Sequence, residues 1–201
     1  FDLSAACTGF LYAMSVADAY IKVGMYKKVL VIGAEVMSQV VDWKDRSVCV
    51  LFGDGAGAVV LGEDSSGKSI FRLHSDSGSA QGKENAVHMN GREIFSFAVR
   101  KVPESVKEVL EESETAKEQV KYFILHQANA RMIESIAKRL DVPVEKFPMN
   151  LETHGNTSAA SIPVLLDELN RQNRLIPGDV LILSGFGGGL SWGSALLEWH
   201  K

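Results

Sequence analysis

The stretch Ser4–Phe10 places a cysteine, Cys7, among small residues and directly before an amphipathic run, Leu11–Val23. The run has no proline or interior glycine and is followed by Gly24, which is typical of a helix and its terminator. Cys7 is therefore expected at or just before the first helical turn, where unpaired N–H groups and the helix dipole lower the pKa of a thiol. This placement favours a nucleophilic thiolate, and the alternative is a buried structural cysteine.

A histidine occupies a second position where chemistry is expected. His126 follows the predicted strand Tyr122–Leu125 and precedes the predicted helix Ala130–Leu140. Open α/β sheets hold functional groups at this place, the carboxyl end of a strand before a helix. A structural histidine is the alternative. The other histidines lack such a setting and are expected at the surface or in structural roles: His74, His88, His154 and His200.

Asn156 stands before a run of small residues that opens a predicted helix reaching Leu169. The asparagine could cap this helix, or it could line a pocket where backbone and ligand meet. Further along, the predicted strand Asp179–Ser184 leads into Gly185–Gly189. We predict a flexible turn there, with exposed N–H groups suited to an oxyanion, and then a closing strand over Leu190–Trp199.

Other segments must position these residues. Strands are predicted at Lys28–Gly33, Ala58–Leu61 and Ile70–His74, and the close succession of strand and helix predicts a parallel α/β sheet. The alternating glycines before Ala58 indicate a strand with close backbone neighbours, and a phosphate-binding loop is the alternative. A surface loop is predicted over Ser75–Asn90, followed by a helix through Arg100 that restarts at Pro103 and ends at Glu112.

The composition narrows the class of protein. The chain has 201 residues, 46% of them hydrophobic, and a net charge of −4, which argues against nucleic acid as a main partner. The sequence contains no apolar run long enough to span a membrane and no signal-peptide pattern. Its two cysteines suit a reducing compartment, so we expect a cytoplasmic protein, and no spacing matches a zinc site. The opening residues, Phe1-Asp2-Leu3, are predicted to end a buried strand, and we expect a larger protein to supply an N-terminal part.

Five strings in this order resemble β-ketoacyl-acyl-carrier-protein synthase III, the family of thiolase-like condensing enzymes that initiates fatty-acid synthesis in bacteria and plastids. The strings are Ala5–Phe10, Leu51–Ala58, His126–Asn129, Gly155–Ser161 and Gly185–Gly189. Relatives differ from this pattern. Thiolases carry a second cysteine in the final glycine loop, elongating condensing enzymes carry a second histidine in place of Asn156, and plant-type polyketide synthases have a different glycine motif around the asparagine.

The resemblance implies a fold and an assembly. The fold would be the thiolase-like five-layered αβαβα α/β fold, here incomplete because roughly the first third is missing. Residues 1–75 would be the remainder of the N-terminal half with the nucleophile, and residues 76–201 the C-terminal half with the histidine and asparagine. The enzyme would be a homodimer that includes the missing N-terminal segment. We expect the inner face of the Cys7 helix to be uncovered, so that this chain alone is not a stable active monomer.

The resemblance also implies a catalytic set of Cys7, His126 and Asn156. Cys7 would take the acyl group of an acyl-coenzyme A, with acetyl-coenzyme A as the expected donor. Malonyl-acyl carrier protein would then lose carbon dioxide and condense with the acyl-cysteine. Neutral His126 and Asn156 would donate hydrogen bonds to the enolate oxygen, and the backbone N–H groups of Cys7 and Gly188 would hold a second oxyanion.

Further contacts are implied outside this set. Arg131 would face the carrier protein, and Ser96 departs from a lysine found in some members. Trp43 and Arg46 could also belong to a solvated loop. The coenzyme A thioester is the substrate, and neither a cofactor nor a metal is implied. The bacterial cytoplasm is expected rather than a plastid stroma. The alternatives are a related Cys-His-Asn ketosynthase of a polyketide or secondary-metabolite pathway, an acyl-binding relative and an inactive fragment. Substrate and coenzyme A contacts are implied for Trp43, Arg46, Phe95, Asn129 and Phe186.

Overall fold

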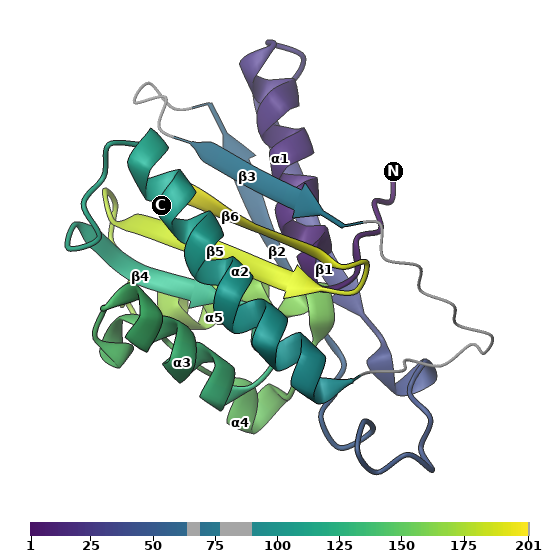
Figure 1. Ribbon diagram of the computed structural model, residues 1–201. Coiled ribbons are helices and arrows are strands. Elements are labelled where there is room, and N and C mark those ends of the chain that lie inside the picture. The colour runs from purple at the N-terminus through teal and green to yellow at the C-terminus, as the bar shows by residue number, and fades with distance from the viewer. Residues whose placement is uncertain (64–68, 77–89, 201) are drawn as a thin grey trace.

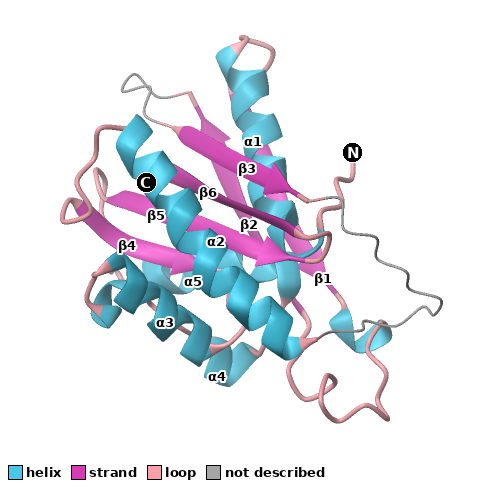
Figure 2. Ribbon diagram, viewed as in Figure 1, coloured by secondary structure: helices cyan, strands magenta, loops and turns pink. Residues whose placement is uncertain are grey.

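The computed structural model describes residues 1–63, 69–76 and 90–200 and arranges them in four layers (Figures 1 and 2). Helices α2 (Gly91–Glu112) and α3 (Ala130–Leu140) cover one face of a four-stranded sheet. Helices α1 (Gly9–Lys22) and α5 (Ser161–Arg171) lie between this sheet and a two-stranded sheet. The described part of the chain therefore forms an αβαβ stack, four layers of the five that the sequence led us to expect.

The two sheets differ in their pairing. The large sheet has the order β3-β6-β5-β4, and the small sheet pairs β1 with β2. Only β4 and β5 run parallel among the described strands, so the prediction of a parallel sheet was wrong for the other pairs. No α-helix connects β1 to β2 or β5 to β6, and parallel strands need a crossover of a dozen or more residues, usually a helix. The strand bounds are β1 (Lys28–Glu35), β2 (Gly55–Gly62), β3 (Ile70–Ser75), β4 (Val120–Leu125), β5 (Val180–Gly187) and β6 (Ser191–Glu198).

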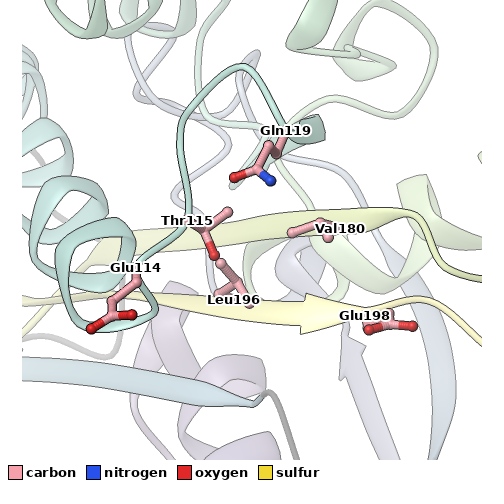
Figure 3. A pocket seen from close by; sticks show the side chains of 6 residues that line it. All are labelled: Glu114, Thr115, Gln119, Val180, Leu196 and Glu198. Carbon is pink, nitrogen blue, oxygen red and sulfur yellow. The ribbon is translucent and has the colours of Figure 1, made fainter. Parts of the chain in front are cut away.

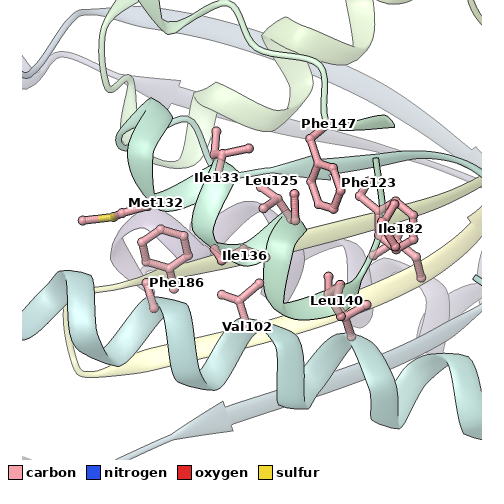
Figure 4. Close-up of a cluster of buried hydrophobic side chains, with 14 of the residues drawn as sticks. Val102, Phe123, Leu125, Met132, Ile133, Ile136, Leu140, Phe147, Ile182 and Phe186 are labelled. Atoms are coloured by element: carbon pink, nitrogen blue, oxygen red, sulfur yellow. The ribbon is translucent and has the colours of Figure 1, made fainter. Parts of the chain in front are cut away.

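Alternating side chains on the central strands build two hydrophobic cores. Phe123, Leu125 and Ile182 point toward α2 and α3 (Figure 4). Ile124 lies between the first two in sequence and joins the opposite core with Leu181, against α1 and α5. This period of two is the pattern of strands buried on both faces, and it explains why β4 and β5 are continuous apolar runs.

Helix α1 is covered on its core side. Phe10, Leu11 and Met14 are all buried between the two sheets, so the expectation of an uncovered inner face was wrong. The exposed apolar surface lies instead on the outer side of the small sheet, where Leu30 is 60% exposed and Val60 is 64% exposed. Successive strand residues point to opposite faces, and only the inner face of β1 and β2 packs on α1 and α5.

Helix α2 runs without interruption through Pro103, where the sequence predicted a restart. Its N-cap is Asn90, whose side chain accepts hydrogen bonds from the backbone N–H groups of Arg92 and Glu93. A proline inside a helix removes one backbone hydrogen bond. Val102 and Val106 on either side are fully buried, and we infer that this packing holds the two parts in one helix.

Short elements complete the described chain, and the predicted helices and strands are otherwise confirmed within a few residues. The division at residue 75 stays a prediction, although β3 pairs with β6 and thus belongs to the sheet of the second segment. Most of the predicted loop before α2, residues 77–89 with His88, lies outside the described residues. Within the described part, no helix is long and apolar enough to cross a membrane. The short elements are η1 (Ala6–Thr8), η2 (Met37–Gln39), η3 (Val144–Lys146), α4 (Leu151–His154) and η4 (Ser158–Ala160).

Candidate active site

Cys7 lies in the single 3₁₀ turn η1, immediately before α1. The end of β5 packs directly against it, since a Cβ added at Gly187 would lie 2.7 Å from the Cβ of Cys7 and 3.1 Å from its Sγ. The preceding residue, Ala6, has a φ of 46°, in the left-handed region that non-glycine residues rarely adopt. The cysteine is therefore held by a strained turn on one side and by a glycine strand on the other.

His126 is buried at the end of β4, and its backbone N–H donates to the carbonyl of Ser184 on β5. Its Nδ1 lies 2.7 Å from the Oγ of Ser161, which also accepts a hydrogen bond from the backbone N–H of Gln127. The hydrogen bond from Gln127 uses one acceptor site of the hydroxyl and leaves its proton available, and we assign that proton to the bond with Nδ1. Nε2 of His126 then carries the ring proton and is a donor.

Burial lowers the pKa of His126 from 6.5 to about 4. The imidazole is therefore neutral near neutral pH. Its ring meets the edge of Phe186, with the ring centroids 5.4 Å apart. A neutral histidine with its proton on Nε2 can donate a hydrogen bond without first being protonated.

Asn156 is fixed through both its backbone and its side chain. Its backbone N–H donates to Leu51, and its carbonyl accepts from the N–H of Gly53. Its Oδ1 accepts from the backbone N–H of Ser158 at 2.9 Å. The side chain thus caps the turn through its oxygen, and its N–H groups are the atoms left to serve as donors.

The segment Asn156–Ser161 connects these residues. Asn156 begins it, the Ser158 hydroxyl hydrogen-bonds with the Cys7 thiol, and the Ser161 hydroxyl bonds with His126. The elements η1 and η4 are in contact with each other and with β5 or β1. One six-residue stretch therefore gathers a thiol, a neutral imidazole and an amide at the end of the central strands.

The pKa of the Cys7 thiol is raised above its ordinary value, contrary to the lowered pKa that its helix position predicts. Burial is the largest cause, since it disfavours the thiolate. The hydrogen bond from Ser158 acts in the opposite direction, and the negative charge of Glu35 raises the pKa further. The sequence could not show how much protein surrounds the sulfur.

Comparison with known proteins matches the segment that contains Cys7 and the segment that contains His126 and Asn156. Residues 1–79 match the family model for 3-oxoacyl-[acyl-carrier-protein (ACP)] synthase III, and residues 110–199 match the model for its C terminal part. The crystal structure of 3-oxoacyl-[acyl-carrier-protein] synthase III from Aquifex aeolicus is 45% identical, with a TM-score of 0.94 over 99% of this chain and 67% of that one. The chain belongs to the 3-oxoacyl-[acyl-carrier-protein] synthase III family. Its fold is therefore the thiolase-like α/β fold of these condensing enzymes.

Two further synthases are similar to the chain. The β-ketoacyl-[acyl-carrier-protein] synthase III 1 of Bacillus cereus is 48% identical over 204 residues, which cover 100% of this chain and 66% of the relative. The priming β-ketosynthase of the R1128 polyketide pathway is 35% identical, with a TM-score of 0.92 over 100% of this chain and 66% of that one. The chain thus spans about two thirds of the length of the synthases that it matches.

Several residues with expected roles toward substrate, carrier protein or oxyanion lie at or after the ends of β4 and β5. Phe186 is buried against His126, and Asn129 caps α3 by accepting from the N–H of Arg131. Arg131 itself is exposed on the first turn of α3. Gly188 follows β5, and a Cβ added there would lie 3.4 Å from the Cβ of Ala6. The predicted flexible turn was too long, because Gly185–Gly187 belongs to β5 and pairs with β6.

Three other such residues lie on α2 or on the segment between η2 and β2. Trp43 is 65% exposed on the segment between η2 and β2, where its Nε1 donates to the carbonyl of Ser38. Arg46 is exposed on the same segment. Phe95 on α2 packs against the core between α2 and the large sheet. No contact that the structure shows tests a coenzyme A role for these three.

Sequence reasoning missed three polar residues of the site: Glu35, Ser158 and Ser161. The two serines belong to the run of small residues after Asn156, which signalled close packing but not which hydroxyl bonds which partner. Glu35 ends a strand and gave no signal, because only the fold brings it to Ser158.

A small cavity of about 100 Å³ lies away from the candidate site (Figure 3). Its lining includes Val180 at the start of β5, whereas Gly187 at the far end of that strand contacts Cys7. Seven residues of strand separate the two by about 23 Å. Within the described residues, no group of three metal-binding side chains could hold an ion. The cavity is lined by Glu114, Thr115, Gln119, Val180, Leu196 and Glu198.

Proposed function

We propose that this chain carries the reaction centre of a β-ketoacyl-acyl-carrier-protein synthase III. Such an enzyme condenses an acyl-coenzyme A with malonyl-acyl carrier protein, and acetyl-coenzyme A is the first donor to test. In the first half-reaction the Cys7 sulfur attacks the thioester carbon, the bond to the coenzyme A sulfur breaks, and an acyl-cysteine remains. Family membership supports this assignment, and so does the position of the thiol at the end of β5.

The second half-reaction joins the acyl group to the malonyl unit. Loss of carbon dioxide from malonyl-acyl carrier protein leaves an enolate, whose oxygen needs hydrogen-bond donors. The observation that carries the proposal is that one polar atom of each side chain is already bonded to the protein: Nδ1 of His126 to the Ser161 hydroxyl, and Oδ1 of Asn156 to the backbone N–H of Ser158. Nε2–H of the histidine and the amide N–H groups remain as donors, and a neutral donor pair stabilises an enolate without a proton transfer.

The enolate carbon then attacks the acyl-cysteine, and the oxygen of that thioester becomes negative. We propose the backbone N–H groups of Cys7 and Gly188 as its donors. Each such donor contributes on the order of 100-fold or more in rate. Phe186 would close the site beside His126, where it limits the access of water.

The roles of the outer residues are proposed from the family pattern. Arg131 is exposed and cationic on the first turn of α3, which suits contact with an acidic carrier protein. The exposed Trp43 and Arg46 offer an aromatic face and a guanidinium to the adenine and phosphates of coenzyme A. Asn129 and Phe95 are proposed for the region between these surfaces and Cys7.

Priming of a polyketide chain is a second candidate function. The R1128 priming synthase superposes nearly as well as the Aquifex aeolicus enzyme, with TM-scores of 0.92 and 0.94. Its lower identity of 35%, against 45%, favours the fatty-acid role for this chain. A panel of acyl-coenzyme A donors with two purified carrier proteins, one from each pathway, would distinguish the two functions.

The proposed enzyme works as an assembly, and we propose a homodimer in the cytoplasm. Both cysteines, Cys7 and Cys49, are free, as expected in a reducing compartment. The exposed apolar face of the small sheet supports self-association. Light scattering at micromolar concentration measures the assembly directly, and a particle of 21.9 kDa would contradict it.

Labelling by acetyl-coenzyme A tests the proposed function. We expect one acetyl group on Cys7 and none on Cys49, located by mass spectrometry of peptides. A Cys7→Ser variant, whose hydroxyl is a far weaker nucleophile, is the control and should take up no label. Acetylation of Cys49, or none of Cys7 in a folded protein, would contradict the assignment.

A further inference from the structure

Two buried hydroxyls, those of Thr8 and Ser191, join the turn that contains Cys7 to the segment that follows β5. Their oxygens, Oγ1 of Thr8 and Oγ of Ser191, lie 2.6 Å apart. Thr8 is 0% exposed and Ser191 is 5% exposed, so the contact is shielded from water. The two residues are 183 positions apart in the sequence and belong to η1 and β6. The proposed reaction steps give neither hydroxyl a role.

Thr8 closes the turn that contains Cys7. Its Oγ1 lies 2.6 Å from the carbonyl oxygen of Ala5, and its backbone N–H donates to the same oxygen at 3.1 Å. Ala6, inside this turn, has a φ of 46°, a conformation that persists only where its surroundings hold it. Thr8 therefore helps to fix the direction of the backbone N–H of Cys7, which is one of the two donors proposed for the oxyanion on the acyl carbon.

Ser191 holds Gly188 from two sides. Its backbone pairs with Gly187 in the ladder between β5 and β6, and its hydroxyl donates to the carbonyl of Gly188 at 2.9 Å. A glycine has no Cβ to limit its φ and ψ, so contacts of this kind must set the conformation of Gly188. The backbone N–H of Gly188 is the second donor proposed for the oxyanion. Ser191 therefore helps to fix the direction of that N–H.

The two hydroxyls carry two protons, whereas three oxygen–oxygen contacts lie within hydrogen-bond distance: Thr8 with Ala5, Thr8 with Ser191, and Ser191 with Gly188. Two oxygens held 2.6 Å apart without a proton between them would repel, so one proton occupies the contact between Thr8 and Ser191. We assign Thr8 as its donor, because Ser191 then donates to Gly188 while the carbonyl of Ala5 keeps the backbone N–H of Thr8. This arrangement gives both carbonyls a donor and joins η1 to Gly188 continuously.

Both steps at the Cys7 sulfur need the two donors at a fixed separation. When Cys7 attacks a thioester, and again when the enolate attacks the acyl-cysteine, the carbon bonded to the sulfur carries the negative oxygen. Donors stabilise that oxygen only if they lie about 2.7–3.1 Å from it. The segments that carry them touch, because a Cβ added at Gly188 would lie 3.4 Å from the Cβ of Ala6. The separation of the donors therefore depends on how η1 is joined to the segment after β5.

We propose that Thr8 and Ser191 form a positioning pair that sets the separation of the two oxyanion donors, the backbone N–H groups of Cys7 and Gly188. The inference rests on the proposed function, in which Cys7 is the nucleophile. The role needs no contact between either hydroxyl and the substrate, because each hydroxyl acts through the backbone to which it is bonded. Loss of either one removes the same contact and slows each step in which an oxyanion forms on the carbon bonded to the Cys7 sulfur.

Two kinds of reaction of the same thiol test the pair, each followed at Cys7 by mass spectrometry of peptides. Acetyl-coenzyme A and para-nitrophenyl acetate acetylate the thiol through a carbon that carries an oxyanion, whereas iodoacetamide alkylates it at a methylene carbon that carries none. Thr8→Val and Ser191→Ala should each lower both acetylation rates by about 10- to 100-fold, because the donors are misplaced. The alkylation rate should stay within about threefold of the parent rate. The double variant should lose no more than the slower single variant, because both changes remove one contact.

Matched variants separate positioning from folding. Thr8→Ser keeps the hydroxyl and should be acetylated within about threefold of the parent rate. Ser194→Ala removes another buried hydroxyl of β6, one that donates to Ser184 on β5, and should also stay within about threefold. A merely structural role for the pair would change acetylation and alkylation together, and that result overturns the proposal. Unchanged acetylation of a folded Ser191→Ala protein also overturns it, even if Thr8→Val fails to fold.

The two acetyl donors distinguish this inference from the proposed function, because para-nitrophenyl acetate needs no site for coenzyme A. If only the nitrophenyl ester acetylates Cys7 of the parent, and both single variants lose that rate, the function is contradicted and the positioning pair stands. If acetyl-coenzyme A acetylates the parent and both single variants equally fast, the pair is contradicted and the function stands. A parent protein that neither reagent acetylates at Cys7 contradicts both.

Discussion

Substitution of Gly187 by alanine tests how closely the end of β5 positions the nucleophile. The added Cβ would lie 2.7 Å from the Cβ of Cys7, 3.1 Å from its Sγ and 3.3 Å from its backbone nitrogen. Carbon atoms in contact lie about 3.5–4.0 Å apart, so Cys7 must move by about 1 Å. A displacement of that size at a reacting atom costs on the order of 100-fold in rate, and overpacking costs about 1–3 kcal/mol of stability.

The assay is the rate of acetyl transfer to Cys7, followed by intact mass, together with urea unfolding. Gly62→Ala, at the end of β2, is the matched control, because nothing lies within 4 Å of the Cβ that it adds. We expect the control to stay within about threefold of the parent, and Gly187→Ala to lose about 100-fold. A folded Gly187→Ala protein that reacts as fast as the control would refute the reasoning.

Three further outcomes are expected. Alanine in place of His126 or Asn156 should leave the rate of acetyl transfer to Cys7 within about threefold of the parent rate. The rate of malonyl decarboxylation should fall by on the order of 100-fold, because the donors of these two residues serve the enolate. Equal losses in the mass-spectrometric assay of acetylation and the carbon dioxide assay of decarboxylation would contradict these roles. The unfolded His126 binds a proton below a pKa of about 6.5, whereas burial lowers its pKa in the fold to about 4. The free energy of unfolding should therefore fall by up to about 3 kcal/mol as pH drops across this window, and urea titrations should show a flatter dependence for His126→Gln. The double substitution of Leu30 and Val60 by lysine should lower the light-scattering mass at micromolar concentration, and an unchanged mass would show that the small-sheet face does not drive association.

Much of the fold was readable because its signals are local. The apolar runs of β4 and β5 and the amphipathic pattern of α3 each appear in one stretch of sequence. The glycines before Ala58 correctly indicated close backbone neighbours, since a Cβ at Gly57 would lie 2.8 Å from the backbone of Pro163 and Val164 on α5. Strand direction was not readable, because antiparallel pairing of β1 with β2 depends on packing between distant segments.

The candidate site shows the same limit. The residue types and order of Cys7, His126 and Asn156 stand out in the sequence, but their protonation states do not. The thiol pKa is raised because the surrounding layers exclude water, and the imidazole tautomer depends on Ser161, 35 residues away. Long-range contacts of this kind set the protonation states of the thiol and the imidazole, and a local sequence pattern does not indicate them.

The segment Asn156–Ser161 has a consequence for how such an enzyme can change over generations. Its backbone and hydroxyl groups support the thiol, the imidazole and the amide at once. Under the proposed mechanism, loss of the Asn156 side chain affects decarboxylation alone, whereas a shift of the segment's backbone moves the supports of both half-reactions together. Changes in donor preference are therefore expected outside these six residues under the same mechanism.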